Sequence, residues 1–446
     1  MKTFTPLLTT QKKIWFLIFD ILIFLAAFAI AIMARFSGLH ISMPVNIELV
    51  LLALAVPTLQ YIFGNYDLDH ISDFKQLLAR QIVAIIFTLL FATLVTYIFA
   101  TERAGIFGRG ILFIALGGFF VLSLAYRSAV ASYLKKIKGT LKWLILADHK
   151  TQEIVKKDFA QLDFEGTLNF LTPEEALQSK DWLSQKWSTI VVSITNHEHQ
   201  SQLGPVIIDA KCSGLNTITI TTFYERHLRK VPVHLLDYAW FINAGGFYSI
   251  TNPVKLRLKR IIDISLSLFL LILTAPVLFL TALAIRLESK GNAVYSQIRT
   301  GKDNKPFTIY KLRSMRSDAE KDGAKWAQKN DNRITRVGKM IRLTRLDELP
   351  QLWNVLRGDM SFVGPRPERP EFNEMLKKEL PFYELRHIVR PGITGWAQVL
   401  YPYGASVEDS KEKLQFELYY IKHSGTMLDL LIILKTIRVV VGARGR

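Results

Sequence analysis

Two adjacent carboxylates, Asp347 and Glu348, lie in the stretch LDELPQLWNVLRGDMSFVGPRP, at residues 346–367 of a chain with a formal net charge of +18. Arginines flank this pair on both sides: Arg342, Arg345 and Arg366. Carboxylates are oxygen ligands of the kind that Mg²⁺ takes, an aspartate can attack phosphorus, and a guanidinium fork matches a phosphate group. These residue types predict phosphoryl transfer, in which positioning and charge neutralisation dominate. A structural ion-pair network would use the same residues, so the interpretation depends on the neighbouring elements.

The carboxylates stand at the start of a predicted short helix. Pro350 suits its first turn, apolar residues recur from Leu352 to Leu356, and Gly358 suits its end. Neighbours on a helix point about 100° apart, so the two carboxylates have to serve different directions. Arg366 lies between two prolines, on a stiff segment that would hold its guanidinium at a low entropy cost.

Discrete apolar runs raise the mean hydropathy of the chain to +0.21, a high value for a soluble protein. Four runs come before residue 135: Ile14–Met33, Val50–Phe63, Ile82–Ala100 and Ile111–Ala125. A helix needs about 20 apolar residues to cross a bilayer, so the first and third runs are long enough and the other two fit a bundle. Residues 1–135 are therefore predicted to form a bundle of four transmembrane helices. Basic residues before the first run and after the fourth place those ends in the cytoplasm.

A different pattern follows in residues 141–245, where buried-strand segments alternate with polar helical segments. The strand candidates are LKWLILA from Leu141, STIVVSI from Ser188 and NTITIT from Asn216. This alternation predicts a Rossmann-like α/β module with a parallel sheet. A dinucleotide site needs a glycine-rich turn after the first strand, whereas this strand runs into ADHKTQE. The module is therefore predicted to be structural or regulatory and to bind no dinucleotide.

A basic linker occupies residues 246–260, and a fifth apolar run follows at 261–287. This run contains Ala275-Pro276, and a proline kinks a helix. Both flanks are basic, so the run is either an ordinary spanning helix or a kinked helix that enters the inner leaflet and returns. Residues 288–446 are polar and basic. Within them AVYSQIRTGKDNKPFTIYKLRSM, from Ala293 to Met315, predicts a hairpin around GKDN, and Lys413–Val441 predicts two amphipathic helices suited to the membrane interface.

Three segments resemble the signatures of the bacterial sugar transferase family, the polyprenyl-phosphate hexose-1-phosphate transferases, also called monotopic phosphoglycosyl transferases. They are QIRTGKDNKPFTIYKLRSM, LDELPQLWNVLRGDMSFVGPRP and RPGITGWAQV. The resemblance covers essentially all of residues 254–446, and the preceding helices and α/β module are similar to the long members of the family. The segment YPYGASVEDSKEKLQFELYYIKH, from Tyr401 to His423, is similar to the exopolysaccharide branch. It implies a re-entrant membrane helix broken at Ala275-Pro276, followed by a small α/β catalytic domain at 288–446.

The resemblance also implies a reaction. A sugar-1-phosphate would move from a UDP-sugar to undecaprenyl phosphate, with release of UMP, at the cytoplasmic face of the bacterial inner membrane. This is the first membrane step of exopolysaccharide or O-antigen repeat-unit synthesis. Asp347 would attack the β-phosphorus and carry a covalent phosphosugar, and Glu348 would help to hold Mg²⁺, for which both carboxylates are candidate ligands. Substrate-binding positions of the family fall on Gln297, Arg299, Lys311, Arg313, Arg342, Arg345, Gln351 and Arg366, with weaker matches at Arg390, Thr394 and Gln398.

Other classes of protein fit the sequence less well. A membrane-tethered UDP-sugar dehydratase or epimerase would need the dinucleotide fingerprint, which the sequence lacks. A non-catalytic scaffold of a polysaccharide assembly machine would not need the carboxylate pair with its arginines. The positive charge fits membrane lipid and phosphorylated substrates, and the sequence carries no nucleic-acid-binding motif. Glucose and galactose are the sugars expected first, N-acetylated sugars stay open, and a homodimer is neither required nor excluded.

Overall fold

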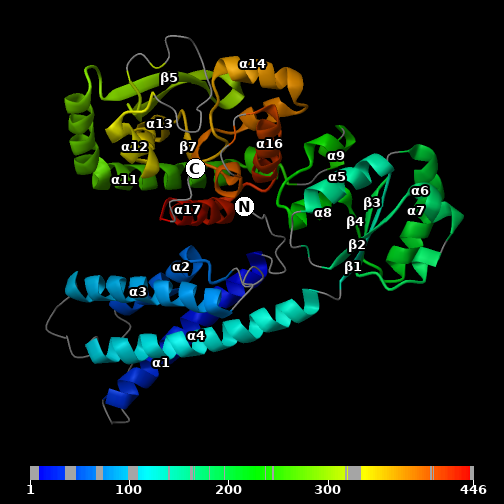
Figure 1. Cartoon of the computed structure of the whole chain (residues 1–446), viewed down its shortest axis with the longest axis horizontal. Coiled ribbons are helices and arrows are strands. Elements are labelled where there is room, and N and C mark those ends of the chain that lie inside the picture. Colours follow the sequence, from blue (N-terminus) through cyan, green and yellow to red (C-terminus); the bar gives the residue numbers. More distant parts are fainter. Residues whose placement is uncertain are drawn as a thin grey trace. The chain divides into compact units, whose positions relative to one another are not determined.

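The computed structural model describes residues 10–35, 47–66, 74–98, 109–138, 141–160, 164, 166–179, 181–194, 196–236, 238–243, 246–316, 319, 333–401, 404 and 406–441. The chain divides into two compact units, Lys2–Ile220 and Thr221–Arg446. The boundary falls at the start of helix α8 (Ile220–His227; Figure 1).

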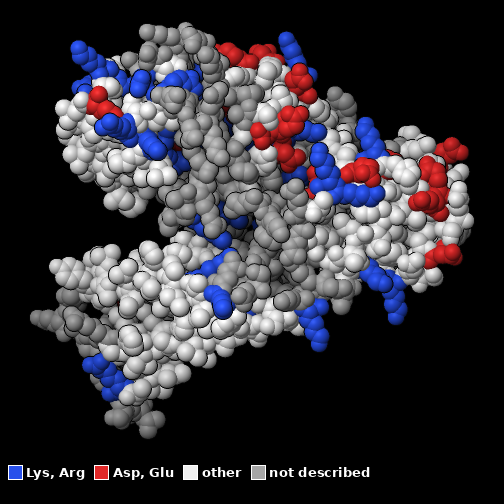
Figure 2. All heavy atoms as spheres, in the orientation of Figure 1, with Lys and Arg blue, Asp and Glu red and all other residues white. Residues whose placement is uncertain are grey.

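Four apolar helices open the first unit: α1 (Thr10–Arg35), α2 (Ile47–Ile62), α3 (Phe74–Ile98) and α4 (Arg109–Lys138). Their shared core includes Phe24, Phe28, Leu52, Ala115 and Phe119, while many of their other apolar side chains face outward. The outer surface of these helices carries few charges (Figure 2). All four predicted helices are present. By length and composition α1, α3 and α4 can cross a membrane, whereas α2 is a shorter apolar helix.

A polar cluster is buried inside this group of helices. The Asp20 carboxylate of α1 accepts hydrogen bonds from Arg127 Nη2 of α4 at 2.5 Å, from Tyr66 Oη at 2.5 Å and from Tyr126 Oη at 2.6 Å. The side chains of Asp20 and Arg127 are both fully buried. A lone charge in apolar surroundings is costly, so the two charges stabilise each other and connect α1 to α4.

The rest of the first unit contains a four-stranded parallel sheet in the order β2-β1-β3-β4. Its strands are β1 (Lys142–Ala147), β2 (Thr167–Leu171), β3 (Thr189–Ser193) and β4 (Thr217–Thr219). Figure 1 shows α6 (Pro173–Gln178) and α7 (His197–Cys212) on one side of the sheet and α5 (His149–Phe159) on the other. Three strands coincide with the predicted ones, and β2 is additional. Asp148 caps α5 by accepting a hydrogen bond from Thr151 N at 2.7 Å, so a carboxylate occupies the helix start that a phosphate would need.

The second unit is built around one long helix, α11 (Pro253–Glu288), which contains Pro276. The short helices α9 (Tyr238–Asn243) and α10 (Tyr248–Thr251) precede it. By length and composition α11 can cross a membrane, and large apolar side chains such as Phe269 and Phe279 are exposed on it. In Figure 1 the ribbon of α11 turns sharply before it reaches β5, as expected for a helix that contains a proline.

The remaining elements of the second unit follow α11 in the chain. The predicted hairpin is confirmed, because β5 (Val294–Thr300) and β6 (Pro306–Leu312) pair antiparallel. After them come α12 (Arg336–Leu343), α13 (Gln351–Arg357), β7 (Ser361–Val363), α14 (Pro370–Glu379), β8 (Gly392–Thr394), α15 (Trp396–Leu400), α16 (Val407–Lys422) and α17 (Thr426–Val441).

The two predicted C-terminal helices are present as α16 and α17, but α16 does not have the predicted interfacial character. Its residues Leu414–Leu418 are all buried, and Leu414, Phe416 and Leu418 belong to the main core of the unit. An interfacial helix keeps one broad polar face in water, whereas α16 is covered on several sides. The prediction is therefore wrong for α16, which is a core helix.

Candidate active site

The carboxylate pair lies on a 3-10 helix, Leu346–Glu348, between α12 and α13. Just before it, Arg345 takes a left-handed conformation with φ of +60°. Asp347 and Glu348 thereby turn into the protein, and each is only 9% exposed. A left-handed conformation costs free energy for a residue other than glycine, and such strain is common at functional sites.

Glu348 is held by three cationic side chains. Arg366 Nη2 donates to Glu348 Oε1 at 2.6 Å, Arg345 Nη1 lies 3.6 Å from the same oxygen, and Lys311 Nζ lies 3.8 Å from it. Burial alone would raise the pKa of Glu348, but the charges of Arg366 and then Lys311 outweigh it and hold that pKa well below its usual range. Glu348 is therefore a permanent anion at the centre of a cationic site.

Asp347 has the opposite electrostatic character. Burial, and then the negative charge of Glu348, raise the pKa of Asp347 above its usual 3.8, although Lys311, Arg342 and Arg345 act against this shift. Its Oδ1 atom is buried, and no described residue gives it a hydrogen bond. Two neighbouring carboxylates whose pKa values are pushed apart are typical of groups with different roles at a catalytic site. The buried Oδ1 is the acceptor in this site that is ready for a substrate atom or a metal ion.

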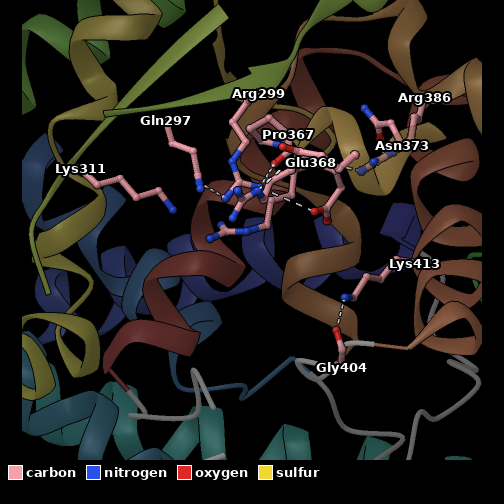
Figure 3. Close-up of polar contacts among 12 residues, drawn as sticks. Gln297, Arg299, Lys311, Pro367, Glu368, Asn373, Arg386, Gly404 and Lys413 are labelled. Carbon is pink, nitrogen blue, oxygen red and sulfur yellow. Dashed lines mark hydrogen bonds and ion pairs between the residues drawn. The ribbon is translucent and has the colours of Figure 1, made fainter. Parts of the chain in front are cut away.

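The hairpin brings further donors to the same side of the site (Figure 3). Arg299 Nη2 donates to Gln297 Oε1 at 2.6 Å, and Arg299 Nη1 donates to the Pro367 carbonyl at 3.3 Å. Figure 3 shows the side chains of Gln297, Arg299 and Lys311 extending toward one another. Burial, and then the positive charge of Arg366, lower the pKa of Lys311 to about 8. The cations are thus crowded together, which is the arrangement expected of a site for a multiply charged anion.

The second and third sequence signatures are paired as parallel strands. Ser361 in β7 is opposite Gly392 in β8, and Val363 is opposite Thr394. The backbones approach closely at Gly364, where an added Cβ would collide with the carbonyl of Arg390, so this position requires glycine. This pairing places RPGITGW directly behind the segment that carries Arg366.

Four of the eight predicted substrate-binding residues interact with the carboxylates, but Arg313 is bound elsewhere; the four are Lys311, Arg342, Arg345 and Arg366. Its terminal nitrogens donate to the carbonyls of Ser289 and Lys290, both at 2.8 Å, and to Ser289 Oγ at 3.0 Å, at the C-terminal end of α11. Arg342 Nε donates to Ser314 Oγ at 2.9 Å, and its charge still acts on Asp347.

Of the other candidates, Gln351 opens α13 and is 1% exposed. Its buried Nε2 atom donates no hydrogen bond to any described residue. Two of the weaker candidates form hydrogen bonds within the fold, and the third is exposed. Thr394 Oγ1 bonds Thr436 Oγ1 at 2.6 Å, Gln398 Nε2 donates to the Ile393 carbonyl at 3.1 Å, and Arg390 is exposed.

Sequence reasoning missed a buried ion pair behind Arg366. Arg386 and Glu417 are 5% and 4% exposed and form two hydrogen bonds of 2.8 Å with each other. Arg386 Nη2 also donates to the backbone carbonyl of Arg366 at 2.8 Å. The two residues are 31 positions apart in the chain, so the sequence gives no signal that they pair.

A magnesium ion would find limited but suitable ligands here. Among the described residues there is no group of three or more His, Cys, Asp or Glu side chains that could hold a metal. Mg²⁺ commonly takes one or two carboxylates and completes its shell with waters and substrate phosphates. Oδ1 of Asp347 is buried and receives no hydrogen bond from the described residues, whereas Glu348 Oε1 is engaged by Arg366. The site fits Mg²⁺ held chiefly by Asp347 together with a phosphate.

Residues 254–443 match the family described as bacterial sugar transferase. The chain belongs to this family, which confirms the resemblance found in its three signature segments.

Individual relatives differ in the sugar that they are named for. The chain is 47% identical over 261 residues to the UDP-N-acetylgalactosamine-undecaprenyl-phosphate N-acetylgalactosaminephosphotransferase of Aeromonas hydrophila, a match that covers 54% of this chain and 61% of that protein. It is 42% identical over 233 residues to the UDP-glucose:undecaprenyl-phosphate glucose-1-phosphate transferase of Escherichia coli, which covers 52% of this chain and 49% of that protein. It is 43% identical over 190 residues to the exopolysaccharide production protein PSS of Rhizobium leguminosarum, covering 41% of this chain and 95% of that protein. The match thus spans about half to three-fifths of the first two relatives and nearly all of the third.

Proposed function

We propose that this protein transfers a sugar-1-phosphate from a UDP-sugar to undecaprenyl phosphate, with release of UMP, at the cytoplasmic face of the bacterial inner membrane. The observation that carries the proposal is the buried pair of unlike carboxylates. Glu348 is held as an anion by Arg366, Arg345 and Lys311, while Asp347 has a raised pKa and a buried oxygen that no described donor reaches. The names of the relatives supply the donor and acceptor classes.

Asp347 is the nucleophile in this proposal. A carboxylate oxygen of Asp347 attacks the β-phosphorus and forms a new P–O bond. The bond between that phosphorus and the bridging oxygen breaks, and UMP leaves with the oxygen. A phosphate oxygen of the lipid then attacks the same phosphorus, the bond to Asp347 breaks, and the carboxylate is regenerated. Because the phosphosugar stays covalently bound to Asp347 between the two steps, the UDP-sugar and the lipid phosphate need not occupy the site at the same time.

The cationic side chains act by positioning and neutralising phosphate charge. Arg366 and Lys311 are fixed by Glu348, so their remaining donors are already oriented when the pyrophosphate arrives. Arg342 acts electrostatically on Asp347 and would also be close to the attacked phosphorus. Mg²⁺, when bound by Asp347 and a substrate phosphate, would withdraw electron density from the phosphorus.

The helix α11 is proposed to be re-entrant, with both ends on the cytoplasmic side. Near its start, Arg260 Nη1 and Nη2 donate to the carbonyls of Val355 and Leu356 at 2.5 and 2.8 Å. Just after its end, Arg313 holds Ser289. Both ends are therefore bound to the same compact unit, while the exposed apolar stretch and Pro276 lie between them. This arrangement would bring the phosphate of a lipid in the inner leaflet to Asp347.

The donor is proposed to carry a hexose or an N-acetylhexosamine. Glucose and galactose are the sugars expected first from the sequence, and two relatives are named for N-acetylgalactosamine and for glucose. A panel of UDP-glucose, UDP-galactose, UDP-N-acetylglucosamine and UDP-N-acetylgalactosamine therefore covers both classes. The proposal requires that one of them support release of UMP that depends on undecaprenyl phosphate.

The test is UMP release by the detergent-purified protein with Mg²⁺ and undecaprenyl phosphate, beside Asp347→Asn. We expect one donor to support lipid-dependent release and the variant to lose at least about a thousandfold, because the amide is a poor nucleophile. Acid quenching with a donor radiolabelled in the β-phosphate and no lipid should leave label on the wild-type protein and none on the variant. Full activity in Asp347→Asn would remove the covalent mechanism, and a folded but inactive wild type would favour a non-catalytic scaffold.

A further inference from the structure

The backbone of Pro365, Arg366 and Pro367 has few N–H groups with which to form hydrogen bonds. Two of these three residues are prolines, which have no N–H, so the segment can be fixed by hydrogen bonds mainly through its carbonyl oxygens. All three carbonyls accept one. Gly392 N donates to the Pro365 carbonyl at 2.8 Å, Arg386 Nη2 donates to the Arg366 carbonyl at 2.8 Å, and Arg299 Nη1 donates to the Pro367 carbonyl at 3.3 Å.

The middle one of these contacts is made by a side chain that is itself tightly held. Arg386 lies on a 3-10 helix, Tyr383–Ile388, and Glu417 lies on α16. Their guanidinium and carboxylate meet fork to fork, with Nε to Oε2 and Nη2 to Oε1 both at 2.8 Å. Arg386 Nη1 donates to Tyr383 Oη at 2.7 Å, and Tyr383 Oη donates to Asn373 Oδ1 at 3.1 Å. Both terminal nitrogens of Arg386 therefore have an acceptor.

We propose that Arg386 and Glu417 are positioning residues for Arg366. They fix its main-chain carbonyl, and through it they aim the Arg366 guanidinium at Glu348 and at the phosphates of the donor. The inference rests on the proposed function, since it assigns these residues to the same reaction. Neither side chain touches the carboxylate pair in the contacts described, so their effect on the reaction has to pass through Arg366.

Geometry explains why an arginine is used here. Arg386 has to satisfy a carboxylate, a tyrosine hydroxyl and a backbone carbonyl at once, and a guanidinium offers five N–H donors in a fixed plane. A lysine at 386 would still neutralise Glu417, but its single ammonium cannot reach all three acceptors in this arrangement. Arg386→Lys therefore keeps the positive charge that neutralises Glu417, which stability needs, but removes the hydrogen bond to the Arg366 carbonyl.

Another ion pair on α16 supplies a matched control. Lys230 Nζ lies 3.0 Å from Glu412 Oε2, and Lys230 is 7% exposed. Glu412 is on the same helix as Glu417, but its partner contacts a different segment of the chain. Glu412→Gln and Glu417→Gln thus remove the same charge from the same helix, and only the second disturbs the support of Arg366.

The experiment measures kcat and KM for lipid-dependent UMP release in wild type, Arg386→Lys, Arg366→Lys and the double variant. A displacement of about 1 Å near the chemistry can cost about a hundredfold, so we expect Arg386→Lys to lose tenfold or more in kcat/KM. The Arg386→Lys and Arg366→Lys variants should show the same pattern, with kcat and KM contributing in similar proportion to the loss of kcat/KM. In the Arg366→Lys background we expect Arg386→Lys to cost less than threefold, because an effect that passes through Arg366 is not additive with its loss. Glu417→Gln should follow Arg386→Lys, and Glu412→Gln should keep wild-type kinetics.

Equal losses in the two backgrounds, or wild-type kcat/KM in a folded Arg386→Lys, would overturn the inference. If Arg386→Lys fails to fold, the paired replacement Arg386→Met with Glu417→Met leaves no lone buried charge and is put through the same cycle. A wild type that releases no UMP would instead overturn the proposed function, and this inference with it. A wild type that is active with additive losses would overturn the inference alone.

Discussion

Replacing Arg313 with alanine is expected to destabilise the second unit rather than to weaken substrate binding. The side chain is 9% exposed and makes three hydrogen bonds of 3.0 Å or less to Ser289 and Lys290. A hydrogen bond to a charged group contributes about 1.5–3 kcal/mol to stability. Truncation lets water reach some of these acceptors, so we expect a loss of about 3–4 kcal/mol rather than the full sum. A cation at the C-terminal end of a helix also interacts favourably with the last carbonyls, so its removal further lowers the stability.

Thermal unfolding in detergent and the KM for the donor sugar nucleotide together test this expectation. Arg313→Ala should lower the midpoint by about 6 °C or more and leave KM unchanged. Gly291 gives an independent perturbation, because its φ is +113° and an added Cβ would lie 2.5 Å from Arg313 Nη1. Gly291→Ala should therefore also lower the midpoint, while the exposed control Arg316→Ala should stay within about 0.5 kcal/mol of wild type. An unchanged midpoint with a tenfold higher KM in Arg313→Ala would refute the reasoning and restore Arg313 as a substrate ligand.

Two further predictions concern other charged groups. Asp20→Leu should destabilise the helices of the first unit by about 3–5 kcal/mol, because it leaves the fully buried Arg127 without its counter-charge. Adding Arg127→Leu should recover most of that loss, and a thermal midpoint of the double variant below that of Asp20→Leu would contradict the pairing. Burial and then Glu348 raise the pKa of Asp347 above 3.8, so activity should fall as the pH drops through that raised value. Glu348→Gln removes a negative neighbour and should shift this acid limb to lower pH, and a pH–rate profile with an unmoved limb would exclude Asp347 as the ionising group.

Local chemistry made much of the candidate site predictable. Gly358 has a φ of +96° and ends α13, as its position in the sequence indicated, and Pro350 stands at the start of the same helix. The hairpin follows from the turn residues between two strand-forming segments, and the structure pairs Val294 with Leu312 through to Thr300 with Pro306. In each case the signal is contained within a few residues, because turn and cap preferences depend on backbone conformation at single positions.

Features that depend on distant partners were not predictable in the same way. β2 was missed because it is an edge strand whose residues are only half-buried, and its apolar signal is therefore weak. Arg313 belongs to a signature that also contains Lys311, yet it lies just beyond the end of β6, and its side chain bonds Ser289, which is 24 residues earlier in the chain and outside the signature. Arg386 and Glu417 are 31 residues apart, and only the folded chain brings them together behind Arg366.

Hydrogen bonds connect the first half of α11 to β7, the strand that leads to Arg366. Asp263 accepts hydrogen bonds from Ser361 Oγ at 2.7 Å and from Phe362 N at 3.0 Å, and Lys259 Nζ donates to the Val363 carbonyl at 3.1 Å. Every residue of β7 is thus bonded to the first half of the helix. Because β7 runs within three residues into Arg366, a change in the depth or tilt of α11 would shift this arginine relative to Glu348. The position of α11 is therefore linked through β7 to the place of Arg366 beside Glu348.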